Sequence, residues 1–227
     1  MNLVTCLVLT AALLFSGCRG EQPAPQRAEV EEGGGGMVIV AMGDSLTAGH
    51  GVSFEQSYPS QLEKKLNAAG YPCRVVNAGV SAETSSGALA RLDWVLTMDP
   101  DIVILETGAN DGLRGIDPQV AEDNIRRILG TLHERGITVV LAGMRMVRNL
   151  GPEYVARFDS IYPRLARESG VIFMPFFLQG VAMEGRFNLE DGIHPNAAGY
   201  AKVVENLFPY VVQAIKRHRA QEKADGS

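Results

Sequence analysis

The chain has 227 residues, of which 46% are hydrophobic and 21% are charged, and its formal net charge is −5. This composition is typical of a globular protein and excludes a disordered, collagen-like or coiled-coil chain. Because acidic residues outnumber basic ones, no positive field is available to attract phosphates, and nucleic acid is not expected as a partner.

Residues 1–17 are expected to be an export signal. The run from Leu3 to Phe15 is almost wholly apolar, yet it is too short to cross a hydrocarbon layer of about 30 Å as a permanent helix. The tetrapeptide Phe15-Ser16-Gly17-Cys18 resembles a bacterial lipobox, in which small residues precede a cysteine that receives a lipid. The resemblance implies lipidation of Cys18 and a membrane-anchored lipoprotein that faces the periplasm or the cell exterior. The alternative is a plain signal peptide and a soluble secreted or periplasmic protein.

Residues 18–36 are predicted to form a tether. The segment after Cys18 is polar, contains Pro23 and Pro25, and ends in four consecutive glycines. Such a composition gives a flexible chain with an r.m.s. span of roughly 20–25 Å. We therefore expect the folded domain, residues 37–218, to be held near a membrane without being inserted in it.

Beyond Gly36, short apolar runs alternate with segments of helical periodicity. The predicted strands are 37–42, 74–76, 102–106, 137–142 and 171–174, and the predicted helices are 59–69, 87–98, 118–135, 152–169 and 196–217. Runs that are apolar on both faces and separated by helices indicate a parallel sheet covered on both sides. The sequence therefore predicts a three-layer α/β/α domain with a five-stranded parallel sheet, followed by a frayed polar tail at 219–227.

Polar residues follow the predicted strands at their carboxyl ends, where parallel sheets bind ligands. Ser45 follows the first strand in Gly43-Asp44-Ser45-Leu46, where a hydroxyl can be exposed as a nucleophile, although the tetrapeptide is equally typical of a turn. Gly79 ends the second strand and either brings a backbone N–H to a substrate oxygen or only permits a turn. Asn110 follows the third strand, and its neutral amide can bind an oxyanion or cap a loop.

The segment Asp191-Gly192-Ile193-His194-Pro195 lies just before the last predicted helix. A three-residue spacing in a turn allows the Asp191 carboxylate to accept the Nδ1–H of His194, which leaves Nε2 free to take a proton from a serine. The alternative for this pair is a helix-capping carboxylate beside a surface histidine. That alternative does not explain the three polar segments at the other strand ends.

Together these segments resemble the SGNH hydrolases, also called the GDSL esterases and lipases, over residues 37–209. The blocks that carry the resemblance are Gly43 to Leu46, Gly79, Gly108 to Asp111 and Asp191 to Pro195, in family order. Residues 110–115, 161–163 and 191–196 are most similar to the bacterial thioesterase I, protease I, lysophospholipase L1 and arylesterase group. The resemblance implies a flavodoxin-like fold and hydrolysis of carboxylic esters, with short to medium acyl or aryl esters, acyl thioesters and lysophospholipids as substrate classes.

The resemblance also implies a role for each candidate residue. It assigns Ser45 as the nucleophile, His194 as the general base and Asp191 as the carboxylate that orients the imidazole. The backbone N–H groups of Ser45 and Gly79 and the side chain of Asn110 are then the donors of an oxyanion hole. The expected partner is a small-molecule ester or lipid, and no metal or organic cofactor is implied.

By the same resemblance, residues 112–115 and 144–150 are expected to flank an acyl pocket. Five apolar side chains in or beside these segments are candidates for its lining, with ordinary packing as the alternative for each: Leu113, Ile116, Met144, Met146 and Val147. Two other functions stay open at this point. One is an acetylesterase that acts on cell-envelope or plant polysaccharide, and the other is a lipoprotein that binds acyl or glycan ligands without hydrolysing them.

Overall fold

The structure is a computed structural model that describes residues 36–146 and 148–225. The predicted signal peptide, the lipidation site Cys18 and the tether up to Gly35 lie outside the described residues, as does Val147. The described residues thus cover the predicted folded domain, apart from Val147, and most of the predicted tail.

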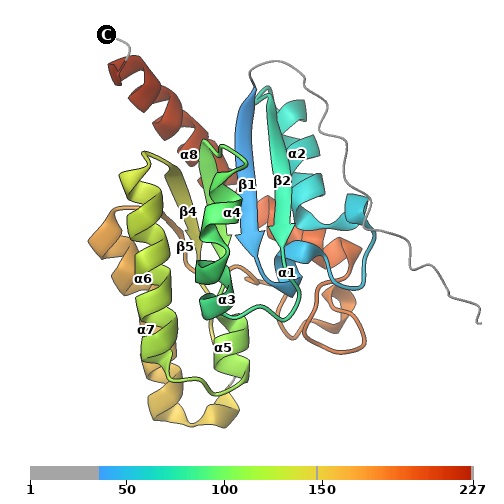
Figure 1. Ribbon diagram of the computed structural model, residues 1–227. Helices are drawn as coiled ribbons and strands as arrows, with labels where there is room; N and C mark the ends of the chain where they lie inside the picture. Colours follow the sequence, from blue (N-terminus) through green and yellow to red (C-terminus); the bar gives the residue numbers. More distant parts are fainter. Residues whose placement is uncertain (1–35, 147, 226–227) are drawn as a thin grey trace, which may run out of the picture. The chain divides into compact units, whose positions relative to one another are not determined.

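Five parallel strands form one sheet at the centre of the domain (Figure 1). They are β1 (Met37–Gly43), β2 (Cys73–Gly79), β3 (Ile102–Glu106), β4 (Thr138–Ala142) and β5 (Ile172–Met174). Their order in the sheet is β2-β1-β3-β4-β5, and every pair of neighbours is parallel. The predicted five-stranded parallel sheet is confirmed.

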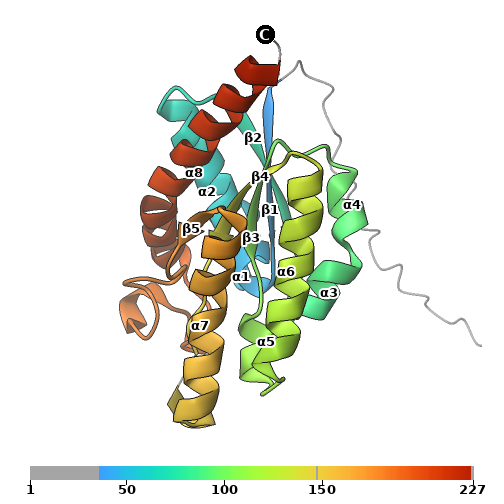
Figure 2. The ribbon, with the colours of Figure 1, turned by 90° about the vertical axis from the view of Figure 1, so that its left-hand side faces the viewer.

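Helices cover both faces of the sheet. α2 (Tyr58–Ala68) and α8 (Ala197–Asp225) pack on one face, and α3 (Ser85–Ala90), α4 (Leu92–Leu96), α6 (Pro118–Glu134) and α7 (Pro152–Ser169) pack on the other. Figure 2 shows the sheet nearly edge-on between these two layers. No helix in the described part of the chain is both long and apolar enough to cross a bilayer.

Two helices differ from their predicted extents by more than one residue at an end. The predicted helix 87–98 is interrupted at Arg91, whose backbone leaves the helical conformation between α3 and α4. There the Arg91 guanidinium forms a 2.6 Å ion pair with Glu83. In addition, α8 continues to Asp225, into the predicted tail. Residues 218–225 contain neither glycine nor proline, so nothing in this sequence interrupts the helix. Gln221 also accepts a hydrogen bond from the Thr138 hydroxyl of β4 (3.1 Å), which holds this part of the helix against the sheet.

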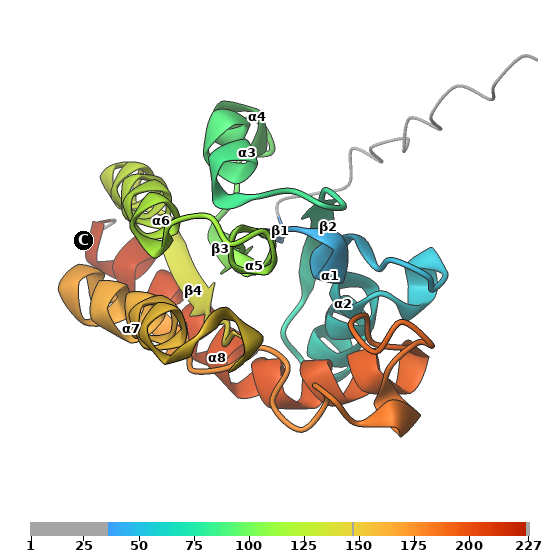
Figure 3. The same ribbon diagram turned by 90° about the horizontal axis from the view of Figure 1, so that it is seen from below.

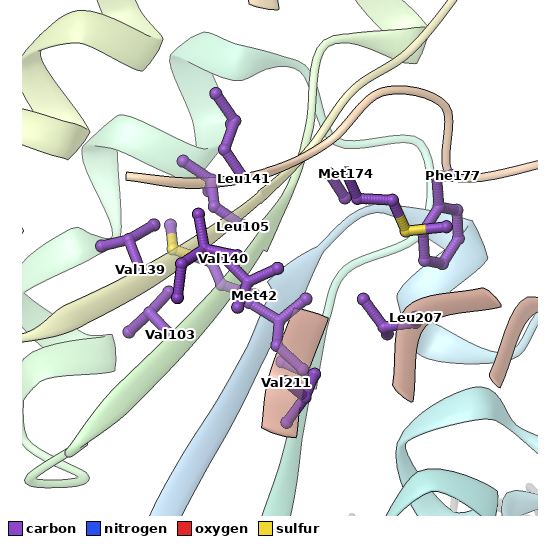
Figure 4. Close-up of a cluster of buried hydrophobic side chains, with 14 of the residues drawn as sticks. Met42, Val103, Leu105, Val139, Val140, Leu141, Met174, Phe177, Leu207 and Val211 are labelled. Carbon is purple, nitrogen blue, oxygen red and sulfur yellow. The ribbon is translucent and has the colours of Figure 1, made fainter. Parts of the chain in front are cut away.

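The core lies between the sheet and its helices. Every residue of β3 and of β4 is buried, which explains why these strands read as continuous apolar runs instead of alternating ones. Figure 4 shows buried side chains around the strands, with Leu207 and Val211 of α8 on the same side of the sheet as Phe177. This packing fixes the strands rigidly and so fixes the position of the loops at their ends.

The carboxyl ends of the strands carry two short helices that the sequence did not predict, α1 (Ser45–Ala48) and α5 (Ala109–Leu113). Figure 3 views the domain from the side of these strand ends and shows α1 and α5 over the middle of the sheet. α1 follows β1 and α5 follows β3, and these two strands are neighbours. The three-residue 3₁₀ turns η1 (Phe54–Gln56), η2 (Arg148–Leu150) and η3 (Gly185–Phe187) complete the connections.

Candidate active site

A tight turn between β1 and α1 presents Ser45 at the carboxyl end of the sheet. Asp44 caps α1 by accepting the backbone N–H of Leu46 on its Oδ1 (2.9 Å). Gly43 ends β1 where a Cβ would lie 2.5 Å from the carbonyl oxygen of Glu106, so a glycine is needed for this close approach to β3. Ser45 is the first residue of α1, and no acceptor among the described residues receives its backbone N–H.

The side chains of Ser45, His194 and Asp191 form a continuous hydrogen-bonded chain. His194 Nε2 lies 2.9 Å from Ser45 Oγ, and His194 Nδ1 lies 2.6 Å from Asp191 Oδ2. Asp191 Oδ1 accepts the backbone N–H groups of His194 (3.0 Å) and Ile193 (2.8 Å). These backbone hydrogen bonds and the His194 ring lower the pKa of Asp191 to about 2. An ionised Asp191 accepts a hydrogen bond from the Nδ1–H of His194, which leaves the lone pair of Nε2 facing the serine hydroxyl.

The turn that carries Asp191 and His194 is held by backbone contacts. The N–H of Leu189 donates to the carbonyl oxygen of His194 (2.8 Å), and Asn188 pairs with Pro195 in an isolated antiparallel bridge. Gly192, at the tip, adopts a left-handed φ of 68°, which glycine does without steric cost. The imidazole is therefore directed back over α1 by a closed loop before α8 begins.

Asn110 lies near the start of α5, directly after β3. Its Nδ2 donates one hydrogen to Asp44 Oδ2 (3.1 Å) and the other to the carbonyl oxygen of Glu83 (3.0 Å). Asn110 lines the same groove as Ser45 and His194. Because both amide hydrogens are engaged, one of them has to leave its acceptor before a substrate oxygen can receive it.

Gly79 does not have the role of a free backbone donor that was predicted for it. Its backbone N–H donates to the Asn77 side chain (3.0 Å) and is not free for a substrate. A Cβ at Gly79 would lie 2.1 Å from the backbone nitrogen of Ala48. The glycine is needed because β2 and α1 touch there, and we do not assign Gly79 to an oxyanion hole.

Ala82, three residues further along, is a position that the sequence analysis missed. It has a left-handed φ of 63°, which is uncommon for a residue with a Cβ and is found preferentially at functional sites. Arg114 Nη2 donates to its carbonyl oxygen (2.6 Å), and the next carbonyl, that of Glu83, receives the Asn110 amide. No acceptor within residues 36–146 and 148–225 takes the N–H of Ala82. A glycine here could have signalled this conformation, whereas an alanine gives no such signal.

A groove of about 340 Å³ opens beside Ser45. Three of the five predicted lining residues, Leu113, Met144 and Met146, do line it. Ile116 does not, because it lies beyond the end of α5, where its carbonyl oxygen accepts the Tyr154 hydroxyl (2.6 Å). The structure does not describe Val147.

The remaining wall of the groove comes from the long connection between β5 and α8. It consists largely of apolar side chains that the sequence analysis missed: Phe176, Leu178, Ala182, Met183 and Ile193. Arg145 also lines the groove, with its guanidinium 5.4 Å from the centre of the Phe176 ring. No periodicity marks this connection in the sequence, since it contains neither a strand nor an α-helix.

Comparisons with known proteins agree with the resemblance seen in the sequence. The model of the GDSL-like lipase/acylhydrolase family matches residues 41–202. The esterase TesA of Pseudomonas aeruginosa is 36% identical over 199 residues, which cover 87% of this chain and 96% of that protein. The thioesterase 1/protease 1/lysophospholipase L1 of Escherichia coli K12 is 38% identical over 159 residues, covering 70% of this chain and 75% of the relative. A crystal structure of TesA superposes with a TM-score of 0.75 at 35% identity, covering 78% of this chain and 99% of the other.

Proposed function

This chain belongs to the GDSL-like lipase/acylhydrolase family, and we propose that it hydrolyses carboxylic esters with Ser45 as the nucleophile. The observation that carries the proposal is the hydrogen-bonded chain from Ser45 through His194 to Asp191, with separations of 2.9 and 2.6 Å. A hydroxyl needs an adjacent base to become nucleophilic at neutral pH, and here the base is in turn oriented by a carboxylate. The relatives' names, esterase, thioesterase and lysophospholipase, describe hydrolysis of acyl esters and thioesters.

In the acylation step, Ser45 Oγ attacks the carbonyl carbon of the ester while His194 Nε2 takes the hydroxyl proton. The resulting imidazolium is stabilised by the ionised Asp191, whose lowered pKa keeps it charged. His194 then gives its proton to the departing alcohol, and an acyl-Ser45 ester remains. Water attacks this ester with His194 again as the base, which releases the carboxylic acid and restores the serine.

Three neutral donors are proposed to stabilise the tetrahedral oxyanion: the backbone N–H groups of Ser45 and Ala82 and the amide of Asn110. The two backbone groups have no acceptor among the described residues, and the Asn110 amide contacts the carbonyl one residue beyond Ala82. Neutral donors that are already in place stabilise developing charge without a cost for reorganising solvent. Asn110 contributes once its amide N–H that donates to Asp44 turns and donates to the oxyanion instead.

The groove supports an acyl chain as the part of the substrate that it binds. Its lining is mostly apolar and includes Leu113, Met144, Phe176 and Leu178. A volume of about 340 Å³ is at the small end of ligand sites and favours short to medium acyl or aryl esters over long chains. A sugar ring would find few hydrogen-bond partners on these walls, which disfavours a polysaccharide acetylesterase.

Membrane attachment through Cys18 is a separate proposal, supported by the small residues that precede this cysteine. In a bacterial host, the wild-type protein is expected in the membrane fraction with a lipid on Cys18, and Cys18→Ser is expected in the soluble fraction. Metabolic labelling with a clickable fatty acid measures the lipid directly. Label retained in Cys18→Ser, or wild type recovered without lipid, contradicts the proposal.

Hydrolysis of p-nitrophenyl esters by purified protein tests the proposed activity. Ser45→Ala is expected to lower kcat by roughly 10⁵- to 10⁶-fold, while Ser160→Ala, an exposed serine of α7, is the matched control and keeps full activity. Comparison of acetate, octanoate and palmitate esters with an acetylated glycan defines the substrate class. Near-wild-type hydrolysis by Ser45→Ala would contradict the assignment of Ser45 as the nucleophile. A preference for the glycan would favour the acetylesterase.

A further inference from the structure

His50, an exposed residue that the proposed reaction does not use, lies beside the catalytic imidazole. It lies two residues beyond the end of α1, and its backbone N–H donates to the carbonyl oxygen of Ser45 (3.1 Å). The centres of the His50 and His194 rings are 4.5 Å apart, with their planes tilted by 44°. The position of His50 is thus fixed by the same short helix that presents the nucleophile.

One ring nitrogen of His50, one of His194 and one carboxylate oxygen of Asp191 lie within 4.8 Å of one another. His50 and Asp191 are exposed and His194 is partly exposed, so an ion in solvent can reach all three. Zn²⁺ binds histidine nitrogen and carboxylate oxygen at about 2.0–2.2 Å. Ligand atoms around such an ion are at most about 4.2 Å apart. Rotation of the exposed His50 side chain brings its ring nitrogen close enough to the other two ligand atoms.

We propose that His50, His194 and Asp191 form an inhibitory site for Zn²⁺. Zinc at Nε2 of His194 takes the lone pair that would accept the Ser45 proton, and zinc at Nδ1 displaces the hydrogen bond to Asp191. Either arrangement removes the general base, so zinc occupancy and hydrolysis exclude each other. This inhibition rests on the proposed esterase function, whereas zinc binding itself does not.

The variant His50→Phe tests the site, because it keeps an aromatic ring beside His194 and removes only the ligand nitrogen. Its hydrolysis without zinc is expected to match wild type, and the zinc concentration for half inhibition is expected to rise at least about tenfold. His50→Gln gives a second substitution without an imidazole, and His133→Gln, an exposed histidine of α6, is the matched control. A chelator is expected to restore wild-type activity.

Isothermal titration of ZnCl₂ into Ser45→Ala measures binding independently of turnover. We expect a site in Ser45→Ala that is weakened at least about tenfold when His50→Phe is added. If the protein fails to hydrolyse esters, the titration still decides whether the zinc site exists. Equal zinc affinity with and without His50, or inhibition that His50→Phe and His50→Gln leave unchanged, overturns the proposal while leaving the esterase function intact.

Discussion

Replacement of Gly79 by alanine is expected to damage activity through the backbone of α1. The new Cβ would lie 2.1 Å from the nitrogen of Ala48 and 2.6 Å from its Cα, whereas real Cβ contacts are essentially never shorter than 3.0 Å. Both neighbours are backbone atoms, so no side chain can rotate away, and α1 has to move by about 1 Å. α1 begins with Ser45, so the movement displaces the proposed nucleophile from His194.

A displacement of about 1 Å at a reacting group costs on the order of 10²-fold in rate, and overpacking of this kind costs about 1–3 kcal/mol of stability. For a domain of this size that loss lowers Tm by roughly 2–12 °C. Gly79→Ala retains its backbone N–H, so a loss of activity cannot come from a missing donor. Hydrolysis of p-nitrophenyl acetate and thermal unfolding measure the two effects.

Gly130→Ala is the matched control for this substitution. Gly130 lies inside α6, is exposed, and has no atom of a neighbouring element within 4 Å of the position of an added Cβ. The control is expected to keep full activity and to gain about 0.5–1 kcal/mol of stability. If Gly79→Ala retains wild-type activity and Tm, the close contact between β2 and α1 does not position Ser45, and the reasoning fails.

Three further predictions concern the catalytic groups. Asp191→Asn is expected to lower kcat by about 10⁴-fold because the imidazole loses its orienting carboxylate, and a loss of only tenfold in steady-state assays contradicts that role. Asn110→Ala is expected to lower kcat by about 10²- to 10³-fold with little change in KM, and an unchanged kcat excludes it as an oxyanion donor. The folded protein lowers the pKa of Asp191 from 3.8 to about 2, so its ionised form adds stability that is fully present above pH 3.8 and is lost as the pH falls toward 2. Denaturant unfolding at several pH values should therefore show that the difference in free energy of unfolding between wild type and Asp191→Asn becomes smaller below pH 3.8. A difference that grows below pH 3.8 would contradict a stabilising, ionised Asp191.

The sequence predicted those parts of the molecule that depend on local patterns. The run 102–106 is apolar at almost every position, and β3 has the same bounds. The segment from Asp191 to Pro195 places a carboxylate and an imidazole in one turn, and the two side chains are in contact. Such features depend on residues close together in the chain, which a sequence displays directly.

Other parts depend on contacts that no local pattern displays. The family resemblance implied that Gly79 belongs to the oxyanion hole, but the close approach that requires a glycine there is to Ala48 and not to a substrate. The strained conformation belongs to Ala82, a residue type that gives no indication of it. The groove wall formed by Phe176 and Met183 lies in an irregular connection whose course is set by tertiary packing. These misses share one physical cause, which is that tertiary contacts override local preference.

The identity of the nucleophile is measured most directly by mass spectrometry of the protein after treatment with a fluorophosphonate. Attack of an activated serine on phosphorus forms a stable adduct that resembles the tetrahedral intermediate. We expect one adduct per chain, located on the peptide that contains Ser45 and absent in Ser45→Ala and in His194→Ala. An adduct on any other residue, or full hydrolytic activity in protein that carries the adduct, would contradict the assignment of Ser45.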